Sequence, residues 1–282
     1  MQKRKLRIGV TAPASRIEPA LAEKVAAIAA AQFPDNAPEL VFHPQCHLSS
    51  GHFAGDDEAR AAAFLDIAND ESFDALWIAR GGYGSGRLAE SVLPALNNAA
   101  RRKTYLGYSD AGALLGAMYA DGFQNLVHGP MPADLLREGG EAAVKRALAF
   151  LVDADSRAVE AAVASSQPTA AFNITILSHL LGTPFEPDLS GHVLMLEEVF
   201  EHMYRIDRAL LHVTSSDNIR RAAGIRLGRC SAIPPNEPPF EQTEEEVAKH
   251  WCTLSGIPYL GRADIGHDIH NKIVPFGRLP AR

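Results

Sequence analysis

The chain has 282 residues, of which 46% are hydrophobic and 22% are charged, and its formal net charge at pH 7 is −7. This composition is typical of a globular protein with one large domain or two smaller ones. The negative charge argues against nucleic acid or an anionic membrane surface as the main partner, and no stretch is long and uncharged enough to span a bilayer.

The cysteines and the first residues indicate a compartment. Cys46, Cys230 and Cys252 are far apart, odd in number and without a Cys-x-x-Cys pair, which fits reduced thiols better than a disulfide framework. The start, Met1 to Lys5, is basic like a signal peptide, but the apolar stretch after it breaks at Pro13. We therefore expect a soluble, cytoplasmic protein.

The first half of the chain alternates apolar runs with segments of helical spacing. The runs predict strands at residues 6–12, 39–43, 75–79 and 125–127, and one from Thr104 to the turn at Gly107. The segments between the runs predict helices at residues 19–32, 56–69 and 141–152, and one directly after Asp110. Strands that alternate with helices predict a parallel sheet with helices on both faces.

Residues 153–168 are small and polar and form the candidate linker between a domain at 1–152 and a domain at 169–282. In the second half we expect strands at residues 192–198 and 223–230 and an amphipathic helix at 204–212. Thr243-x-x-Glu246 is a capping box that predicts the start of another helix. The fold class is therefore α/β.

One serine lies on a turn of the kind that exposes a nucleophile. Gly107-x-Ser109-x-Ala111 stands between the predicted strand and helix, as in a nucleophile elbow, where a tight turn presents the serine hydroxyl above the sheet edge. The first N–H groups of the following helix could receive an oxyanion. The alternative is that Ser109 and Asp110 only cap the helix.

A serine nucleophile needs a base, and the base needs an acceptor that orients it. Among eleven histidines, His267 differs because it follows Gly266 in a loop, and loops carry function more often than element interiors do. Glu197 and Glu198 end an apolar strand, where a carboxylate is costly unless it is hydrogen-bonded or functional. Strand alternation cannot say which of the two points inward, since both faces look buried.

Two other groups of residues could form a different kind of site. His267-x-x-His270 with Asp264, or His43 with His47, could begin a metal site, but neither group has a clean third ligand, and we expect no metal. The glycine-rich run at residues 80–86 could cradle a phosphate, but it lacks the Lys-Ser/Thr of a P-loop. A turn that brings backbone N–H groups close to a reacting oxygen explains these glycines equally well.

Seven ordered motifs together resemble the LD-carboxypeptidases, also called muramoyltetrapeptide carboxypeptidases. The motifs run from the first strand nearly to the C-terminus: Ile8 to Pro13, Arg80 to Gly84, Gly107 to Asp110, His128 to Met131, Leu196 to Val199, Tyr204 to Arg208, and Gly266-His267 with Asn271 and Pro275 to Gly277.

This resemblance implies a serine peptidase with a Ser-His-Glu triad. By motif, Ser109 is the nucleophile, His267 the general base and Glu197, rather than Glu198, the residue that orients His267. The oxyanion hole falls on the backbone N–H groups of Gly82 and Asp110. The implied fold is an N-terminal parallel-sheet domain, flavodoxin-like or glutamine-amidotransferase-like, with a smaller C-terminal β-containing α/β domain that supplies the glutamate and the histidine.

The implied reaction is hydrolysis of the amide between an L-configured diamino acid and the terminal D-alanine of a murein tetrapeptide, in cytoplasmic peptidoglycan recycling. The diamino acid, lysine or meso-diaminopimelate, is left open, and so are the residues that hold the D-alanine carboxylate. Arg80 is a conceivable partner for that carboxylate, but a structural role beside the glycine turn is preferred. The resemblance also implies a homodimer without a cofactor.

Two segments depart from the pattern and bear on the pocket wall. Ala171 and Phe172 replace two glycines before Asn173, and residues 201–204 read Glu-His-Met-Tyr in place of Glu-Pro-Pro-Tyr. The alternative is the related microcin C self-immunity peptidases, which cleave aminoacyl-adenylate analogues and stack the nucleotide on aromatics in a C-terminal loop. Here that loop, residues 233–240, is proline-rich with one aromatic residue, which favours a muropeptide. A binding protein without catalysis is the third hypothesis.

Overall fold

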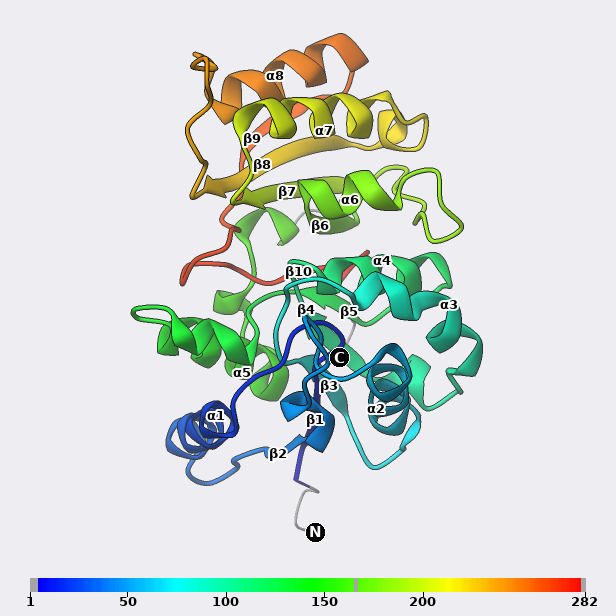
Figure 1. Cartoon of the computed structure of the whole chain (residues 1–282), viewed down its shortest axis with the longest axis vertical. Coiled ribbons are helices and arrows are strands. Elements are labelled where there is room, and N and C mark those ends of the chain that lie inside the picture. Colours follow the sequence, from blue (N-terminus) through cyan, green and yellow to red (C-terminus); the bar gives the residue numbers. More distant parts are fainter. Residues whose placement is uncertain (1–4, 165–166, 280–282) are drawn as a thin grey trace.

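The computed structural model describes residues 5–164 and 167–279, and its helices and strands form two stacked parts (Figure 1). The basic residues 1–4 and residues 165 and 166 of the expected linker lie outside the described residues. The strands are β1 (Arg7–Thr11), β2 (Glu39–Phe42), β3 (Ala75–Ile78), β4 (Thr104–Gly107), β5 (Leu126–His128), β6 (Thr169–Asn173), β7 (Val193–Val199), β8 (Gly224–Ser231), β9 (Tyr259–Arg262) and β10 (Val274–Pro275). The helices are α1 (Pro19–Gln32), α2 (Asp57–Asn69), α3 (Ala89–Val92), α4 (Ala111–Ala120), α5 (Glu141–Asp153), α6 (Ile174–Leu180), α7 (Met203–Ser215) and α8 (Glu244–Ser255).

The first sheet has the strand order β10-β5-β4-β3-β1-β2, and its strands are parallel except for β10, which pairs antiparallel with β5. Alternate residues of β3 are buried on opposite faces of the sheet, as the pleat of a strand requires. Trp77 packs in the apolar cluster that includes Val25 of α1 and Val144 of α5, whereas Leu76 packs in the cluster of α2 and α4. The predicted parallel sheet with helices on both faces is confirmed.

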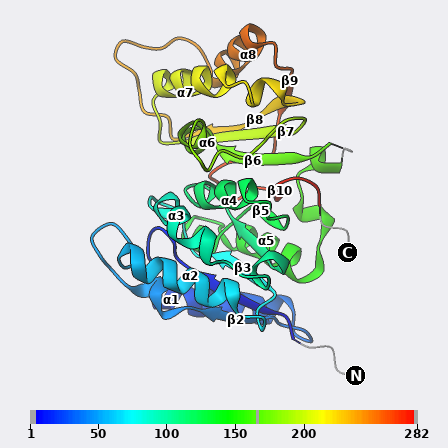
Figure 2. The same ribbon diagram turned by 90° about the vertical axis from the view of Figure 1, so that its right-hand side faces the viewer.

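The second sheet has the order β6-β7-β8-β9 and is parallel throughout. Helices α6, α7 and α8 cover one face, where Leu177, Leu210 and Val247 join the core (Figures 1 and 2). The other face packs on segments before β6 and after β9. The second half of the chain is therefore also α/β, which agrees with the predicted fold class.

The two sheets meet where α4 packs against α6 and where β10 contacts β6 (Figure 2). A Cβ atom at Gly116 of α4 would lie 2.7 Å from Leu180 and 3.1 Å from Phe172, so only glycine allows this close approach. Phe172 is buried there and meets the ring of Phe276 edge-on, with centroids 5.0 Å apart. One of the two substitutions before Asn173 thus fills the contact between the two parts of the molecule.

The predicted elements are confirmed with ends that shift by a few residues. The capping box of α8 is present, with the Thr243 and Glu246 side chains each accepting from the other's backbone N–H. The expected linker contains two short 3-10 helices, Ser156–Ala158 and Ala161–Ala164. The domain boundaries stay a prediction. One strand of the second predicted domain, β10, joins the first sheet. In the described part of the chain no helix is long and apolar enough to cross a bilayer.

Candidate active site

Ser109 lies on the sharp turn between β4 and α4. Its backbone φ is 60°, in the left-handed region that costs a non-glycine residue about 1–3 kcal/mol. Such strain persists where the surroundings fix the turn, and here the strand before it and the helix after it are both buried. This is the geometry predicted for a nucleophile elbow, and it holds the serine side chain at the wall of a cavity.

Asp110 stands at the N-cap position of α4, but its side chain makes no capping hydrogen bond. The alternative interpretation of the sequence required such a bond. The Asp110 carboxylate instead accepts hydrogen bonds from the backbone N–H groups of Gly84 (3.1 Å) and Ser85 (2.9 Å). These are amides of the glycine-rich run that could have cradled a phosphate. The carboxylate of Asp110 occupies these two amides, so this part of the run is ordered by Asp110 and is not a free anion site.

Gly82 lies in the same glycine-rich run and lines the cavity beside Ser109. Its φ is 118°, and a Cβ atom there would lie 2.2 Å from the hydroxyl of Ser15. A side chain at this position is therefore excluded by both conformation and space. Within the described residues, the backbone N–H groups of Gly82 and Asp110 make no hydrogen bond, so both remain able to donate to a ligand.

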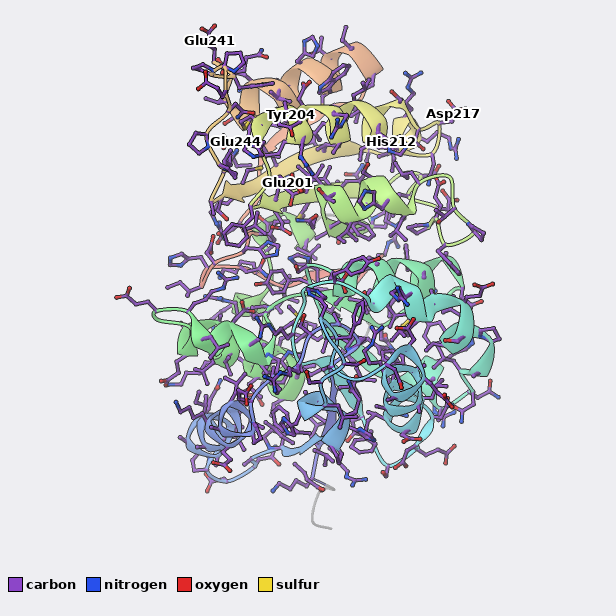
Figure 3. The ribbon with its side chains drawn as sticks, viewed as in Figure 1. Glu201, Tyr204, His212, Asp217, Glu241 and Glu244 are labelled. Carbon is purple, nitrogen blue, oxygen red and sulfur yellow. The ribbon has the colours of Figure 1, made fainter. Side chains whose placement is uncertain are left out.

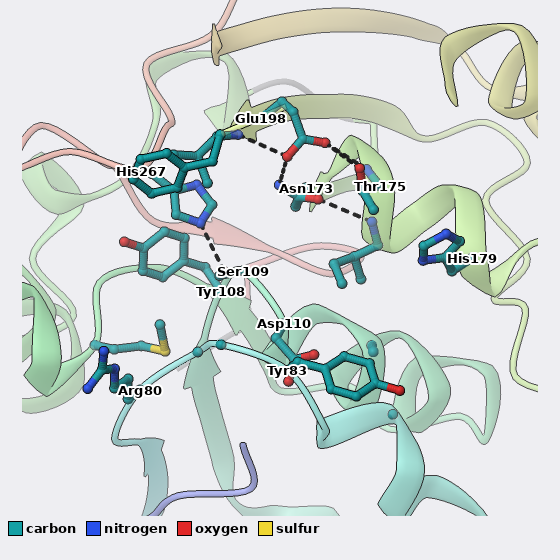
Figure 4. A pocket seen from close by; sticks show the side chains of 18 of the residues that line it. Arg80, Tyr83, Tyr108, Ser109, Asp110, Asn173, Thr175, His179, Glu198 and His267 are labelled. Carbon is teal, nitrogen blue, oxygen red and sulfur yellow. Dashed lines mark hydrogen bonds between the residues drawn. The ribbon is translucent and has the colours of Figure 1, made fainter. Parts of the chain in front are cut away.

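His267 meets Ser109 from the other part of the molecule (Figure 4), and Glu197 of β7 contacts His267 in turn. The Ser109 hydroxyl lies 2.9 Å from Nε2 of His267, and Nδ1 of His267 lies 2.5 Å from Oε2 of Glu197. Because a carboxylate only accepts, Nδ1 carries the proton, and Nε2 of the neutral ring is free to accept from the serine. The structure thus brings together the three residues that the resemblance had selected. Glu198 is not part of this hydrogen-bonded series.

The pKa of His267 reflects two opposed effects. Burial of the ring lowers it, but the charge of Glu197 and the hydrogen bond from Nδ1 raise it more, so the pKa lies above its ordinary value. Glu197 is fully buried at the end of β7. Since little water reaches it, the interaction between this carboxylate and the ring is strong.

The loop that carries His267 is held by residues of the first part of the chain. Oδ1 of buried Asn271 accepts from the Gly266 N–H (3.2 Å) and lies 3.1 Å from Nε2 of His128, which must then be the donor. Arg146 of α5 donates to the carbonyls of Ile269 (2.7 Å) and Asn271 (3.1 Å). These contacts, together with the β5–β10 pairing, fix the histidine loop against the sheet that carries Ser109.

His128 predicts a measurable pH dependence of stability. Burial lowers its pKa to about 4, whereas the unfolded value is about 6.5. The neutral ring therefore stabilises the fold fully above pH 6.5, and this contribution is lost as the pH falls toward 4. Between pH 7.5 and 5.0 we expect a loss of about 2 kcal/mol in the free energy of unfolding from this residue.

Urea unfolding of the wild type and of His128→Gln at both pH values measures this loss, because the glutamine amide can still donate to Asn271. His267 is present in both proteins, so its contribution to the pH dependence of the unfolding free energy cancels in the comparison. The wild type is expected to lose about 2 kcal/mol more than the variant. Equal losses would show that His128 takes up no extra protons on unfolding.

Glu198 organises the start of α6 rather than the histidine. Its carboxylate accepts from the side chain of Asn173 (2.5 Å) and from the backbone N–H (3.0 Å) and hydroxyl (2.8 Å) of Thr175. The Val199 N–H adds a fourth bond at 2.9 Å. Burial raises its pKa above the usual glutamate value, against these hydrogen bonds. The neighbouring carboxylates therefore have different surroundings, which the residue pattern could not distinguish.

The cavity at Ser109 has a volume of about 900 Å³ and lies between the two parts of the molecule. The first part contributes the glycine turn and the segment after β5, including Met131 and Arg137, and the second part contributes α6 and the end of β7. Glu201 also lines it and lies 3.6 Å from Arg205, near exposed Tyr204 at the start of α7 (Figure 3).

The departures from the family pattern have small effects on this cavity. Neither Ala171 nor Phe172 is among its lining residues, and Glu201 is the one lining residue of the segment 201–204. No residue of the loop 233–240 lines it either.

The alternative metal sites do not assemble. Asp264 lies 2.6 Å from Arg229, and Nδ1 of His43 accepts from the backbone N–H of Gln45. Over residues 5–164 and 167–279, no three His, Cys, Asp or Glu side chains gather as a metal ion would require. These side chains are thus explained by contacts within the protein.

Some residues of the site could not be predicted from a local sequence pattern. The pair of His128 and Asn271 and the pair of Glu198 and Thr175 each join distant segments, so no local pattern shows them. His128 and Asn271 did fall within the motifs of the resemblance, which was the one signal available.

Comparison with known proteins shows what the chain is similar to. The murein tetrapeptide carboxypeptidase of Pseudomonas aeruginosa is 27% identical over 247 residues, which cover 80% of this chain and 78% of the relative. The solved muramoyltetrapeptide carboxypeptidase of Oxalobacter formigenes superposes with a TM-score of 0.77 at 21% identity, covering 95% of this chain and 93% of that one. MccF in complex with glutamyl sulfamoyl guanosine superposes with a TM-score of 0.78 at 16% identity, covering 96% and 91%. At these identities the two structures show a shared fold.

The family models decide the membership. The LD-carboxypeptidase N-terminal domain matches residues 8–129, and the LD-carboxypeptidase C-terminal domain matches residues 169–279. The two matches cover most of the chain and include Ser109 in the first and Glu197 and His267 in the second. The chain therefore belongs to the LD-carboxypeptidase family of serine peptidases.

Proposed function

We propose that this peptidase removes the terminal D-alanine of murein tetrapeptides by cleaving its amide bond to an L-configured diamino acid. The observation that carries the proposal is the hydrogen-bonded chain from Ser109 through His267 to Glu197 at the wall of the cavity. The P. aeruginosa relative, which is named for this activity, supports the same substrate class.

In the proposed mechanism the Ser109 hydroxyl attacks the scissile carbonyl while Nε2 of His267 takes its proton. The backbone N–H groups of Gly82 and Asp110 receive the negative charge that develops on the carbonyl oxygen. His267 then gives its proton to the amine of D-alanine, which leaves, and Ser109 is acylated. A water molecule, deprotonated by His267, hydrolyses this ester and regenerates the serine. Glu197 stabilises the imidazolium in both halves.

The test is incubation of the purified protein with a murein tetrapeptide, followed by detection of free D-alanine and of the tripeptide by mass spectrometry. We expect turnover without added metal or cofactor. Parallel reactions with lysine and meso-diaminopimelate at the third position identify the diamino acid. Absence of D-alanine release from both peptides would contradict the proposed function.

The same experiment separates the alternative substrate. An aminoacyl sulfamoyl adenosine, offered beside the tetrapeptide, is the substrate type of the microcin self-immunity branch. Because no residue of the loop 233–240 reaches the cavity, we expect the tetrapeptide to be cleaved and the adenylate analogue to remain intact. Cleavage of the analogue alone would assign the chain to the other branch.

We also propose that the enzyme acts in the cytoplasm as a homodimer, as the resemblance implies. The cysteines support a reducing compartment, because all three are free and Cys46 and Cys252 are buried. Burial raises the pKa of the Cys252 thiol to about 11, which makes it unreactive at neutral pH.

A further inference from the structure

The charged side chains that line the active-site cavity are paired, with one exception. Arg87 lies 2.7 Å from Asp57, and Arg137 lies 3.1 Å from Asp134. Arg80 has no carboxylate partner among the described residues, and its single side-chain hydrogen bond goes to the carbonyl of Arg16 at 3.3 Å. This bond joins the start of the glycine turn to the segment after β1, which is compatible with the structural role preferred from the sequence, and the other guanidinium N–H groups of Arg80 make no hydrogen bond within the described residues.

The acidic groups at the cavity are already satisfied. Asp110 binds two backbone amides, and Glu198 has four donors. Asp134 accepts from the Tyr108 hydroxyl (2.7 Å) as well as from Arg137. The guanidinium of Arg80, which is exposed at the cavity, is therefore the charge left available for a ligand. A guanidinium binds a carboxylate through two parallel N–H···O hydrogen bonds.

The position of Arg80 matches the side of the leaving group. In Figure 4, Ser109 lies between Arg80 on one side and Thr175 and His179 on the other. His267 and Tyr108 lie on the Arg80 side. Because Nε2 of His267 must protonate the departing amine, the D-alanine has to leave on the side of His267. The other arm of the cavity is lined by α6 and the residues after it, and it is open to the rest of the peptide.

We infer that Arg80 binds the terminal carboxylate of the substrate and so makes the enzyme a carboxypeptidase. This inference rests on the proposed function. A substrate that ends in D-alanine presents its carboxylate beside the departing amine, whereas a chain that continued past D-alanine would have no carboxylate to present there. Arg80 is thus a specificity-determining residue, and it takes no part in the proton transfers.

The test compares a murein tetrapeptide with the same peptide carrying a C-terminal amide. For the wild type we expect kcat/KM to be roughly 10- to 100-fold higher for the free acid, the range for a charge-assisted hydrogen bond. In Arg80→Gln the free-acid peptide is expected to lose this advantage, while the amidated peptide is cleaved at the wild-type rate. The ratio of the two kcat/KM values then approaches one. Arg80→Lys keeps the charge but loses the paired geometry, and its ratio should be intermediate.

Arg87→Gln is the matched control, because Arg87 also lines the cavity but is paired with Asp57. It should keep the wild-type preference for the acid. Two results would overturn the inference: an Arg80→Gln protein that keeps the preference, or one that loses rate equally on both substrates. A wild type that cleaves acid and amide equally would also overturn it while leaving the peptidase activity intact. A wild type that cleaves neither would remove the proposed function and this inference with it.

Discussion

Ser109→Ala is expected to lower kcat for D-alanine release by about 10⁶-fold, as loss of the nucleophile does in other serine peptidases. The reason is geometric. The hydroxyl that lies 2.9 Å from Nε2 of His267 is the one group at this position that can form the acyl-enzyme. The measurement is D-alanine release at saturating tetrapeptide, combined with labelling by a fluorophosphonate, which should modify the wild type and leave the variant unlabelled.

The matched control is Ser91→Ala, on the exposed side of α3, where the hydroxyl only bonds the carbonyl of Leu88 in its own helix region. That variant should retain wild-type activity and labelling. Folding of Ser109→Ala is checked by thermal unfolding, because the substitution keeps Cβ and the strained φ. If a folded Ser109→Ala protein released D-alanine at the wild-type rate, the serine mechanism would be wrong.

The local part of the site could be predicted from the sequence because its signals are local. Thr104–Gly107 reads as a buried strand, the small residues after Asp110 read as a helix, and a serine between them has few other conformations to adopt. The role of Asp110 could not be read in the same way. Its carboxylate reaches amides 25 and 26 residues away, so it does not make the capping bond that the alternative interpretation required.

The contact between the two parts of the molecule was not readable from the residue pattern. His267 is 158 residues from Ser109 and 70 residues from Glu197 in the chain, and only the fold brings them together. The resemblance to a family supplied this pairing, and it also chose Glu197 over Glu198 where strand alternation could not. The structure gives the physical difference, since one carboxylate faces the imidazole and the other faces the start of α6.

The elements that were missed are those with weak patterns. β6 is Thr-Ala-Ala-Phe-Asn, with one β-branched residue, and α6 has seven residues, fewer than the spacing analysis needs. β10 has two residues, and one of them is proline. They nevertheless position the site: α6 lines the cavity, and β10 follows the loop of His267 directly. Sequence patterns therefore fail to predict short elements that are held in place by tertiary contacts.

Glu197→Gln is expected to lower kcat by about 10⁴-fold, the loss seen when the orienting carboxylate of such a triad becomes an amide. A glutamine can donate to Nδ1 of His267 and so favour the tautomer with its proton on Nε2, which cannot accept from Ser109. The acid limb of the pH profile should move as well. In the wild type, kcat/KM rises with pH through the raised pKa of His267, because only the neutral ring is a base.

Removal of the carboxylate charge leaves burial as the main effect on His267, and burial favours the neutral ring. The acid limb of Glu197→Gln is therefore expected at lower pH than that of the wild type, although the rate at every pH is smaller. Glu198→Gln makes the same chemical change one residue away, in a carboxylate that bonds Asn173 and Thr175, and its acid limb should stay at the wild-type pH. Equal shifts in the two variants would mean that His267 senses the summed charge of the strand end, and the assignment of Glu197 as its partner would fail.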